Sequence, residues 1–311
     1  MRGIVEERRE GTAWRSPTHL LCAFAPRLSF TFFLHAVFVA SLPAQAGSLV
    51  AVLPGSARAA GMGGVGAAIV GDAGAIFANP AALATVHHLA IEAEYESYPS
   101  GGTLSTGALA LRAGRFTWGV GAAALGPTYT SADLLGASSL VLRSGMVALG
   151  ATAKYVRETV GGARVDAWAG DAGLAIAVFD LMALGVSVQN IGGDFGPAAC
   201  GLHLPRRTRA GFTLNYVDPQ GTLRLLTTLE GQWPAAGAGS AFVVLGLESG
   251  VVARGIGVLG RIGYVGHSTA TSASPFTAGA SVELGRLHLD YAYRADDALG
   301  ARHRMGLRWM P

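Results

Sequence analysis

The chain has few charged residues and, beyond its first 46 residues, no long apolar run. Charged residues make up 14% of the 311 positions, against about 25% in ordinary soluble domains, whereas 50% are hydrophobic and 45 are glycine. So much apolar surface excludes an intrinsically disordered protein. The nearest approach to a membrane helix, residues 172–188, is interrupted by Asp180 and Gly185. A helical membrane protein, which needs about 20 apolar residues per span, is therefore a weak alternative.

Cysteine is also scarce, and basic residues are not clustered. The two cysteines are Cys22 and Cys200. Because Cys22 lies in a segment that we expect to be removed, we predict neither an intrachain disulfide nor a cysteine-based metal site. The net charge of +3 comes mostly from arginines spread along the whole chain. This distribution does not indicate nucleic-acid binding.

The N-terminal region has the pattern of a secretory signal peptide. Arginines precede the apolar run LSFTFFLHAVFVA at residues 28–40, which is too short to span a membrane as a helix. Ala44 and Ala46 then fit the small-x-small rule for signal peptidase. We predict that residues 1–46 are a cleaved signal peptide and that the chain is exported. An uncleaved N-terminal membrane anchor is the alternative.

Alternation of apolar and polar residues with a period of two dominates the rest of the chain. In RLHLDYAYR, residues 286–294, the side chains from Leu287 to Tyr293 that fall on one face are apolar, and those on the other face are polar. About 14 such segments, many of them separated by turn residues, are typical of short strands. We expect them to begin near Leu89, Leu104, Phe116, Ser138, Met146, Arg164, Leu181, Thr208, Thr222, Ser240, Gly255, Phe276, Arg286 and Ala301.

Alternation by itself fits a soluble sandwich as well as a membrane barrel, and three features favour the barrel. The strands approach the ~9–11 residues that cross a bilayer at a tilt. The chain is expected to be exported, yet it has few charges and no disulfides. One face of nearly every strand is apolar, while the other carries isolated charges and glycines, as a lumen would.

The predicted fold is therefore all-β. Because a bilayer cannot satisfy open sheet edges, the sheet must close on itself. We predict a transmembrane antiparallel up-and-down β-barrel of about 14 strands over residues 89–311, located in the bacterial outer membrane and surrounded by its lipid. Aromatic residues near strand ends are candidates for the interfacial girdles, namely Tyr95, Tyr216, Tyr293 and Trp309.

No arrangement of residues indicates catalysis or a bound metal or cofactor. The histidines are scattered, and the Gly-x-Ser-x-Gly motif of a nucleophilic serine is absent. His288 and Asp290 share a strand face with Arg286, but lumen charges of this kind more often stabilise a barrel than catalyse a reaction. We predict that the protein is not an enzyme and has no catalytic residues, no metal site and no cofactor.

Residues 56–83 are crowded with glycine and alanine and carry only Arg58 and Asp72 as charges. The run GMGGVG at residues 61–66 invites comparison with a dinucleotide-binding loop. That motif requires a strand before it, a helix after it and a βαβ unit around it, whereas this chain continues into β alternation. Nucleotide binding is therefore not expected.

The same stretch resembles the N-terminal signature of the FadL-like outer-membrane barrels, above all their PorV/PorQ-type branch. The matching residues are Gly61, Met62, Gly63 and Gly64, then Asp72, then Asn79, Pro80 and Ala81. Residues 188–193 and 204–211 resemble a mid-barrel segment of that branch, and residues 289–304 resemble its closing hairpin. Trp309, near the end of the final strand, resembles the signal that barrel-assembly machinery reads, although it lies two residues before the chain end.

The resemblance implies a 14-stranded barrel in which residues 47–88 fold inward as a plug or hatch, with the eight signature residues as its gating motif. Asn79 and Pro80 fit a turn where the plug meets the wall, and fixing that turn is as good an explanation as gating. The implied function is transport of hydrophobic small molecules across the outer membrane. The alternative is a PorV-type docking barrel, whose partners are secretion-system or cargo proteins of type IX secretion.

Overall fold

The computed structural model describes residues 49–53, 55–99, 101–126, 132–160, 162–178, 181–195, 203–217, 221–235, 240–266, 273–296 and 300–311. The chain divides into two units, Met1–Pro43 and Ala44–Pro311, and all described residues belong to the second. The predicted signal peptide, Cys22 and Cys200 lie outside the described residues. Among the helices of the described part, none is both long and apolar enough to span a membrane.

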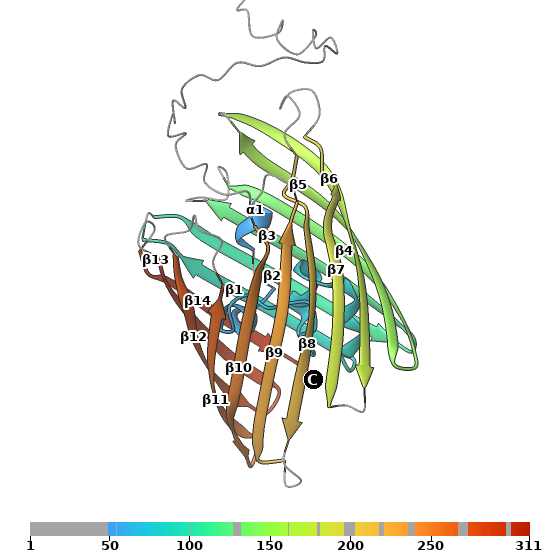
Figure 1. The fold of residues 1–311 in the computed structure, drawn as a ribbon, viewed down its shortest axis with the longest axis vertical. Coiled ribbons are helices and arrows are strands. Elements are labelled where there is room, and N and C mark those ends of the chain that lie inside the picture. The colour runs from blue at the N-terminus through green and yellow to red at the C-terminus, as the bar shows by residue number, and fades with distance from the viewer. Residues whose placement is uncertain are drawn as a thin grey trace, which may run out of the picture. The chain divides into compact units, whose positions relative to one another are not determined.

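Fourteen antiparallel strands of the described chain close into a barrel, in which consecutive strands pair and β1 pairs with β14 (Figure 1). This confirms the predicted fold class. The strands are β1 (Leu89–Ser97), β2 (Thr103–Ala113), β3 (Phe116–Gly126), β4 (Asp133–Ser144), β5 (Val147–Val160), β6 (Ala163–Val178), β7 (Met182–Gly192), β8 (Arg207–Val217), β9 (Leu223–Pro234), β10 (Phe242–Ala253), β11 (Ile256–Val265), β12 (Ala273–Leu284), β13 (Leu287–Asp296) and β14 (Arg302–Trp309).

Twelve strands begin within two residues of the predicted positions; β12 begins three residues earlier, at Ala273, and β4 differs most. It begins at Asp133 rather than near Ser138, so that predicted start is wrong by five residues. The run Asp133-Leu134-Leu135-Gly136 has adjacent leucines and no alternation, and only its pairing with β3 and β5 makes it a strand. Pairing with neighbours, rather than local pattern, decides strand ends of this kind.

Alternation along each strand separates a lipid-facing side from an interior side. In β1, Glu92 and Glu96 are buried while Ile91 and Tyr95 are exposed. Glu92 lies opposite Arg308 of β14 in the strand register. The charged face of the strands is therefore the inner one, as the sequence predicted, and the apolar face points outward.

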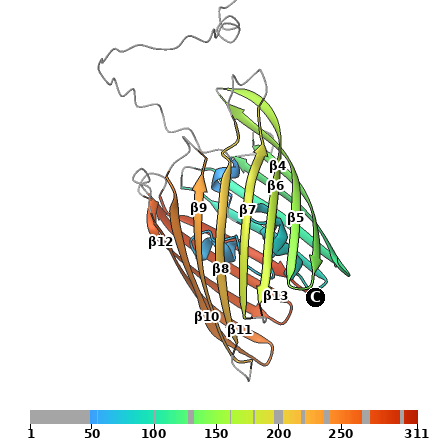
Figure 2. The ribbon, with the colours of Figure 1, turned by 45° about the vertical axis from the view of Figure 1, so that its right-hand side comes forward.

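The residues before β1 form four short helices, drawn in blue to teal among the strands (Figure 2). They are α1 (Leu49–Val52), α2 (Ala57–Gly61) and the 3-10 helices η2 (Ala73–Phe77) and η3 (Pro80–Thr85). We call residues 49–88 the N-terminal segment. Helix α2 packs against β11–β14, while η2 packs against β1–β4 and η3 against β3–β7. These helices thus contact strands on opposite sides of the closed barrel; a plug inside it stays a prediction.

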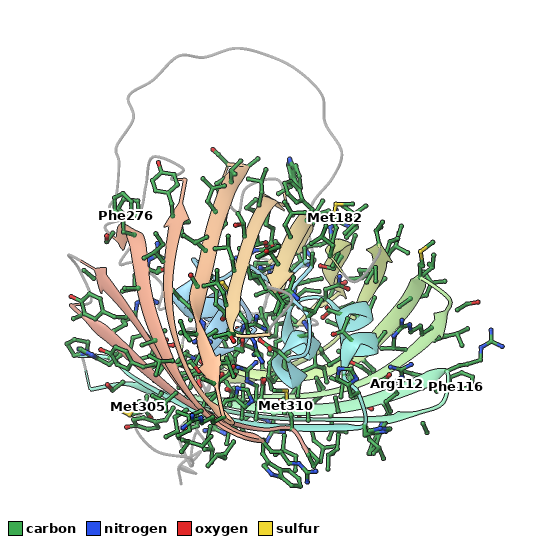
Figure 3. The ribbon with its side chains drawn as sticks, turned by 90° about the horizontal axis from the view of Figure 1, so that it is seen from below. Arg112, Phe116, Met182, Phe276, Met305 and Met310 are labelled. Carbon is green, nitrogen blue, oxygen red and sulfur yellow. The ribbon has the colours of Figure 1, made fainter. Side chains whose placement is uncertain are left out.

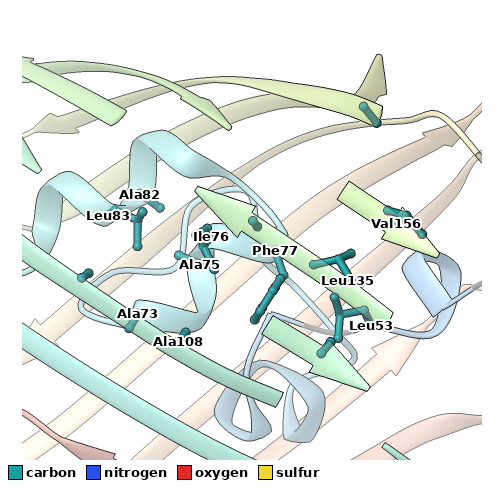
Figure 4. Packing of buried hydrophobic residues seen from close by; sticks show 14 of the residues in the cluster. Leu53, Ala73, Ala75, Ile76, Phe77, Ala82, Leu83, Ala108, Leu135 and Val156 are labelled. Atoms are coloured by element: carbon teal, nitrogen blue, oxygen red, sulfur yellow. The ribbon is translucent and has the colours of Figure 1, made fainter. Parts of the chain in front are cut away.

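The larger hydrophobic cluster joins the N-terminal segment to β1–β6 (Figure 4). Ile76, Phe77 and Leu83 of the segment are all at most 4% exposed. Glycines of β3 make room for them, since a Cβ added at Gly121 would lie 2.8 Å from the Phe77 ring. Glycine therefore permits a close approach between segment and wall here.

Candidate functional site

The Gly61–Gly64 turn of the N-terminal segment lies against β10–β12. The Thr277 hydroxyl donates to the Gly61 carbonyl (3.0 Å) and accepts from the Gly63 amide (2.9 Å). Gly63 and Gly64 have φ of +82° and +81°, a backbone conformation that side chains disfavour. Met62 is fully buried and packs with apolar residues of β9–β11. These four signature residues therefore form one tight, wall-bound turn.

Asn79, Pro80 and Ala81 lie on the other side of the interior, against β5 and β6. The Asn79 side chain accepts from the Ala81 amide (3.0 Å) and so caps η3, in which Pro80 occupies the first turn. Its amide nitrogen also donates to the Ala67 carbonyl (2.5 Å) and, more weakly, to Leu174 of β6 (3.3 Å). Asn79 thus fixes the turn and also ties it to the wall; a gating role stays a prediction.

Asp72, the remaining signature residue, is the charged centre of the segment. Its carboxylate accepts hydrogen bonds from Arg308 (2.5 Å), Arg58 (3.1 Å) and Ser56 (2.9 Å). Burial alone would raise the pKa of Asp72, but the guanidinium groups of Arg308 and Arg58 lower it below its usual range. Asp72 is therefore held as a carboxylate between one arginine of the segment and one of the wall.

These contacts belong to a closed ring of six alternating charges, which we call the charge ring. Arg58 binds Glu248 through two nitrogens (2.8 and 2.7 Å). Arg261 in turn binds Glu248 (2.5 Å) and Asp290 (2.8 Å), and Asp290 meets Arg308 (3.4 Å). In order, the ring is Arg308, Asp72, Arg58, Glu248, Arg261 and Asp290.

The charge ring is buried and electrically balanced. Each of its side chains is at most 11% exposed, and its three arginines match its three carboxylates. Two members, Arg58 and Asp72, come from the N-terminal segment, and four come from β10, β11, β13 and β14. Buried charges are tolerated only when paired and hydrogen-bonded, a condition that the ring meets.

Other wall carboxylates bind backbone amides of the segment. One oxygen of Glu230 accepts from both Gly66 and Ala67 (2.6 Å each), while Arg209 holds its other oxygen (3.0 Å). Glu92 accepts from Gly74 (2.6 Å), and Glu94 accepts from Ala57. Amides outside regular structure need such partners when buried. Together with the charge ring, these carboxylates make β8–β14 and β1 a polar wall.

The opposite side of the interior is an apolar wall. Between the two ends of the barrel, the inward residues of β2–β4 are small, apolar or hydroxyl-bearing, such as Ala108, Gly119 and Val141. One buried ion pair, Lys154 with Asp171 (2.6 Å), lies on the neighbouring β5 and β6. It supports Asn190, whose φ is +58° at an irregularity of the sheet. The segment meets this wall mainly through the apolar cluster.

A cavity lies where the apolar wall meets the end of the N-terminal segment. It is small, about 40 Å³, and partly open to solvent. Its lining is almost entirely apolar and includes Ile69 and Ala82 of the segment with Ala148, Ala175 and Ala183 of β5–β7. Arg143 and Thr85 supply the polar groups of the lining. Its apolar lining favours an apolar ligand, which could enter only as the segment moves away from the wall, because the space is far below the ~300–1,000 Å³ of ligand pockets.

Three histidines of the described chain each pair with one polar side chain, and His203 contacts Asp194 in this way (2.5 Å). His288 pairs with Glu283 (3.0 Å), and His303 pairs with Tyr291 (2.8 Å). In the described residues, no three His, Cys, Asp or Glu side chains are placed to hold a metal ion. Sequence reasoning singled out Asp72 but missed its partners Arg58 and Arg308. The available signal was that Arg58 and Asp72 are the only two charged residues in residues 56–83 and have opposite signs.

Comparison with solved structures identifies the fold. The chain resembles the Ralstonia pickettii toluene transporter TbuX (TM-score 0.55, 14% identity, 83% of this chain and 99% of that one). It also resembles the CymD monoaromatic hydrocarbon channel (TM-score 0.57, 13% identity, 81% and 95%) and a Pseudomonas aeruginosa FadL homologue (TM-score 0.54, 12% identity, 82% and 98%). The chain has the FadL-type barrel fold.

The FadL-type fold agrees with the predicted location in the bacterial outer membrane. No protein-family model matches the chain, and no curated protein does either. The three solved structures are described as a toluene transporter, a monoaromatic hydrocarbon channel and a FadL homologue; that the chain is not an enzyme stays a prediction.

Proposed function

We propose that the protein passes small hydrophobic molecules across the outer membrane, with the N-terminal segment as a plug that yields on one side. The observation that carries this proposal is the division of the interior into a polar and an apolar wall. Both walls contact the segment, but through different chemistry. Solved barrels of the same fold include a toluene transporter and a monoaromatic hydrocarbon channel.

The two walls differ in the free energy required to separate them from the N-terminal segment. Separation from the polar wall would break the Arg308–Asp72 and Arg58–Glu248 contacts, and losing one partner of a buried ion pair costs about 3–5 kcal/mol. Separation from the apolar wall would expose mainly apolar surface, at about 25 cal/mol per Å². An apolar molecule that enters the gap would cover that surface again. The route therefore runs between η2, η3 and β2–β6.

The cavity beside Ala82 and Ala175 lies at the end of this route. Its lining selects for molecules that are small and mostly apolar, since a charged group there would find few partners. Any such molecule needs more space than the cavity holds, so the segment must move from the apolar wall, and a compact hydrocarbon requires less movement than a long-chain lipid. We therefore place compact, uncharged hydrophobes first among candidate substrates.

A pair of substitutions on β6 tests this proposal. Ala175→Leu fills the cavity, while Ala172→Leu adds the same atoms on the exposed outer face of the strand. We expect cells that produce the Ala175→Leu barrel to take up labelled toluene several-fold more slowly than cells with the native barrel, and the Ala172→Leu barrel to behave as native. Equal uptake by all three barrels, at a rate above that of cells without the protein, would place the route elsewhere. Uptake no faster than in cells without the protein would remove the transport proposal.

The PorV-type docking barrel is the second candidate, and the resemblance of residues 188–193 to that branch favours it. Mass spectrometry of the protein extracted gently from native membranes separates the two. A small apolar molecule at near-stoichiometric level supports transport. Secretion-system or cargo proteins without such a molecule support docking. Both candidate functions require insertion by barrel-assembly machinery. We expect that machinery to contact the last strand, where Trp309 faces outward.

A further inference from the structure

One end of the barrel carries a set of arginines at its tight turns. This end is where β1 begins and β14 ends, and four of its hairpins turn through two residues: Gly114-Arg115, Gly145-Met146, Arg254-Gly255 and Gly285-Arg286. Three of the four turns contain an arginine. Arg112 lies two residues before the Gly114-Arg115 turn, and Arg143 lies two residues before the Gly145-Met146 turn. We call these five residues, Arg112, Arg115, Arg143, Arg254 and Arg286, the arginine rim.

The rim arginines differ from the interior ones in their partners. Arg58, Arg261, Arg304 and Arg308 each bind carboxylates inside the barrel. Within the described residues, none of the five rim arginines forms an ion pair with a carboxylate. Their side-chain bonds are to turn carbonyls, from Arg112 to Gly114 (3.3 Å) and from Arg143 to Gly145 (3.1 Å), and to a hydroxyl, from Arg115 to Ser144 (3.5 Å). Within the described part of this end, the rim is therefore a set of arginines without carboxylate partners.

Backbone geometry at one position shows that an arginine is accommodated there against local preference. Arg254 has φ of +54°, in the left-handed region. The first position of a two-residue turn of this kind favours asparagine, aspartate or glycine. The other three turns meet the same requirement with glycine at φ near +60°, at Gly114, Gly145 and Gly285. The Arg254 side chain therefore occupies a turn position that glycine or asparagine would fill with less strain.

Large apolar side chains lie immediately next to the rim on the outer face. Phe116 is 53% exposed and Ile256 is 56% exposed, each directly after a rim turn. In the view from below, Arg112 and Phe116 lie together at the outer edge of the ring of strands (Figure 3). The arginines thus stand where the lipid-facing apolar band ends, which is the depth of lipid head groups.

We propose that the arginine rim binds anionic phospholipid head groups of the inner leaflet. Short turns of outer-membrane barrels face the periplasm, so this end meets the phospholipid leaflet. Guanidinium groups bind phosphate oxygens bidentately, and the neighbouring Phe116 and Ile256 fit the acyl boundary below the head group. A soluble acidic protein or peptidoglycan would match the charge but not the adjoining apolar band.

The test measures lipid retention by native mass spectrometry of the full-length protein. The barrel is exchanged with mixed micelles that hold equal amounts of phosphatidylglycerol and phosphatidylcholine with the same acyl chains. We expect the native barrel to retain phosphatidylglycerol several-fold over phosphatidylcholine, and this preference to fall as salt rises, since surface charge is screened. Equal retention of the two lipids by the native barrel would overturn the proposal.

Two doubly substituted barrels with equal change of charge provide the matched comparison. Arg115→Gln with Arg286→Gln alters the rim, whereas Arg157→Gln with Arg164→Gln alters β5 and β6 at the opposite end. We expect only the first to lose about half or more of the phosphatidylglycerol preference, in line with a contribution from each basic residue near the surface. Equal loss in both would assign the preference to overall charge. Loss of bound peptidoglycan fragments, with lipid retention unchanged, would assign the rim to the cell wall instead.

Discussion

Asp72 and Arg308 form a buried ion pair across 236 positions of sequence, with 2.5 Å between the Asp72 Oδ1 and Arg308 Nη1 atoms. Asp72 belongs to the N-terminal segment, and Arg308 belongs to β14, the strand that closes the barrel on β1. The Asp72–Arg308 ion pair thus connects the N-terminal segment to the strand that closes the barrel. Because Arg308 also meets Asp290 (3.4 Å), loss of Asp72 would disturb the wall as well as the segment.

Substitution of Asp72 by asparagine should destabilise the protein strongly. It leaves Arg308 and Arg58 with one fewer carboxylate in a buried site, and removing one partner of a buried ion pair costs about 3–5 kcal/mol. The free energy of unfolding in denaturant, measured in detergent, gives the value. Asp166→Asn is the control, because Asp166 and Arg157 form an ion pair that is 48% and 39% exposed and is worth about 0–1 kcal/mol. Similar losses in the two variants would contradict the assigned role of the charge ring.

Removing both segment charges together should be less harmful than the two single changes suggest. The double variant Arg58→Met/Asp72→Leu leaves Glu248, Arg261, Asp290 and Arg308, which remain paired and neutral. Each single change leaves an unbalanced charge instead. A double-mutant cycle on the free energy of unfolding should therefore show a coupling of about 1–3 kcal/mol. Additive single effects would mean that charge balance in the ring has no energetic importance.

The contribution of Asp72 to the stability of the folded protein should change with pH only under acidic conditions. Its pKa is lowered in the folded protein by Arg308 and Arg58 against the effect of burial. A lowered folded pKa adds stability that is complete above the unfolded value, about 3.9, and is lost as pH falls through the folded value. The difference in melting temperature between the native barrel and Asp72→Asn should be constant from neutral pH to about pH 5. It should shrink below about pH 4; shrinkage already near pH 6 would contradict the lowered pKa.

Much of the fold could be predicted because successive residues of a barrel strand alternate between two environments and differ in polarity accordingly. Glu92, Glu94 and Glu96 alternate with Ile91, Ala93 and Tyr95, and in a closed barrel that pattern assigns one face to the lumen and the other to lipid. The start of β4 could not be predicted, since Leu134 and Leu135 are adjacent and only cross-strand pairing decides which of them faces inward.

The charge ring could not be predicted from the sequence for a different reason. Arg58 is 190 positions from Glu248, and the pairing of the two depends on how the segment sits in the closed barrel. The composition still gave a hint, because Arg58 and Asp72 are the only charges in residues 56–83. A pair of opposite charges in a segment otherwise made of small residues indicates partners elsewhere in the interior, although not which ones.

Disulfide locks on the two walls should have opposite effects on transport. In a Cys200→Ser background, Ala57→Cys with Gly306→Cys ties the segment to the polar wall, where a Cβ at residue 306 would lie 2.9 Å from the Ala57 Cβ. Ile76→Cys with Gly121→Cys ties it to the apolar wall, where a Cβ at residue 121 would lie 3.0 Å from Ile76. Uptake of labelled toluene should survive the first lock and fall about tenfold or more under the second, with recovery on reduction, since only the second closes the proposed route. The reverse result would mean that the segment leaves the polar wall, and indifference to both locks would mean that it is not a moving plug.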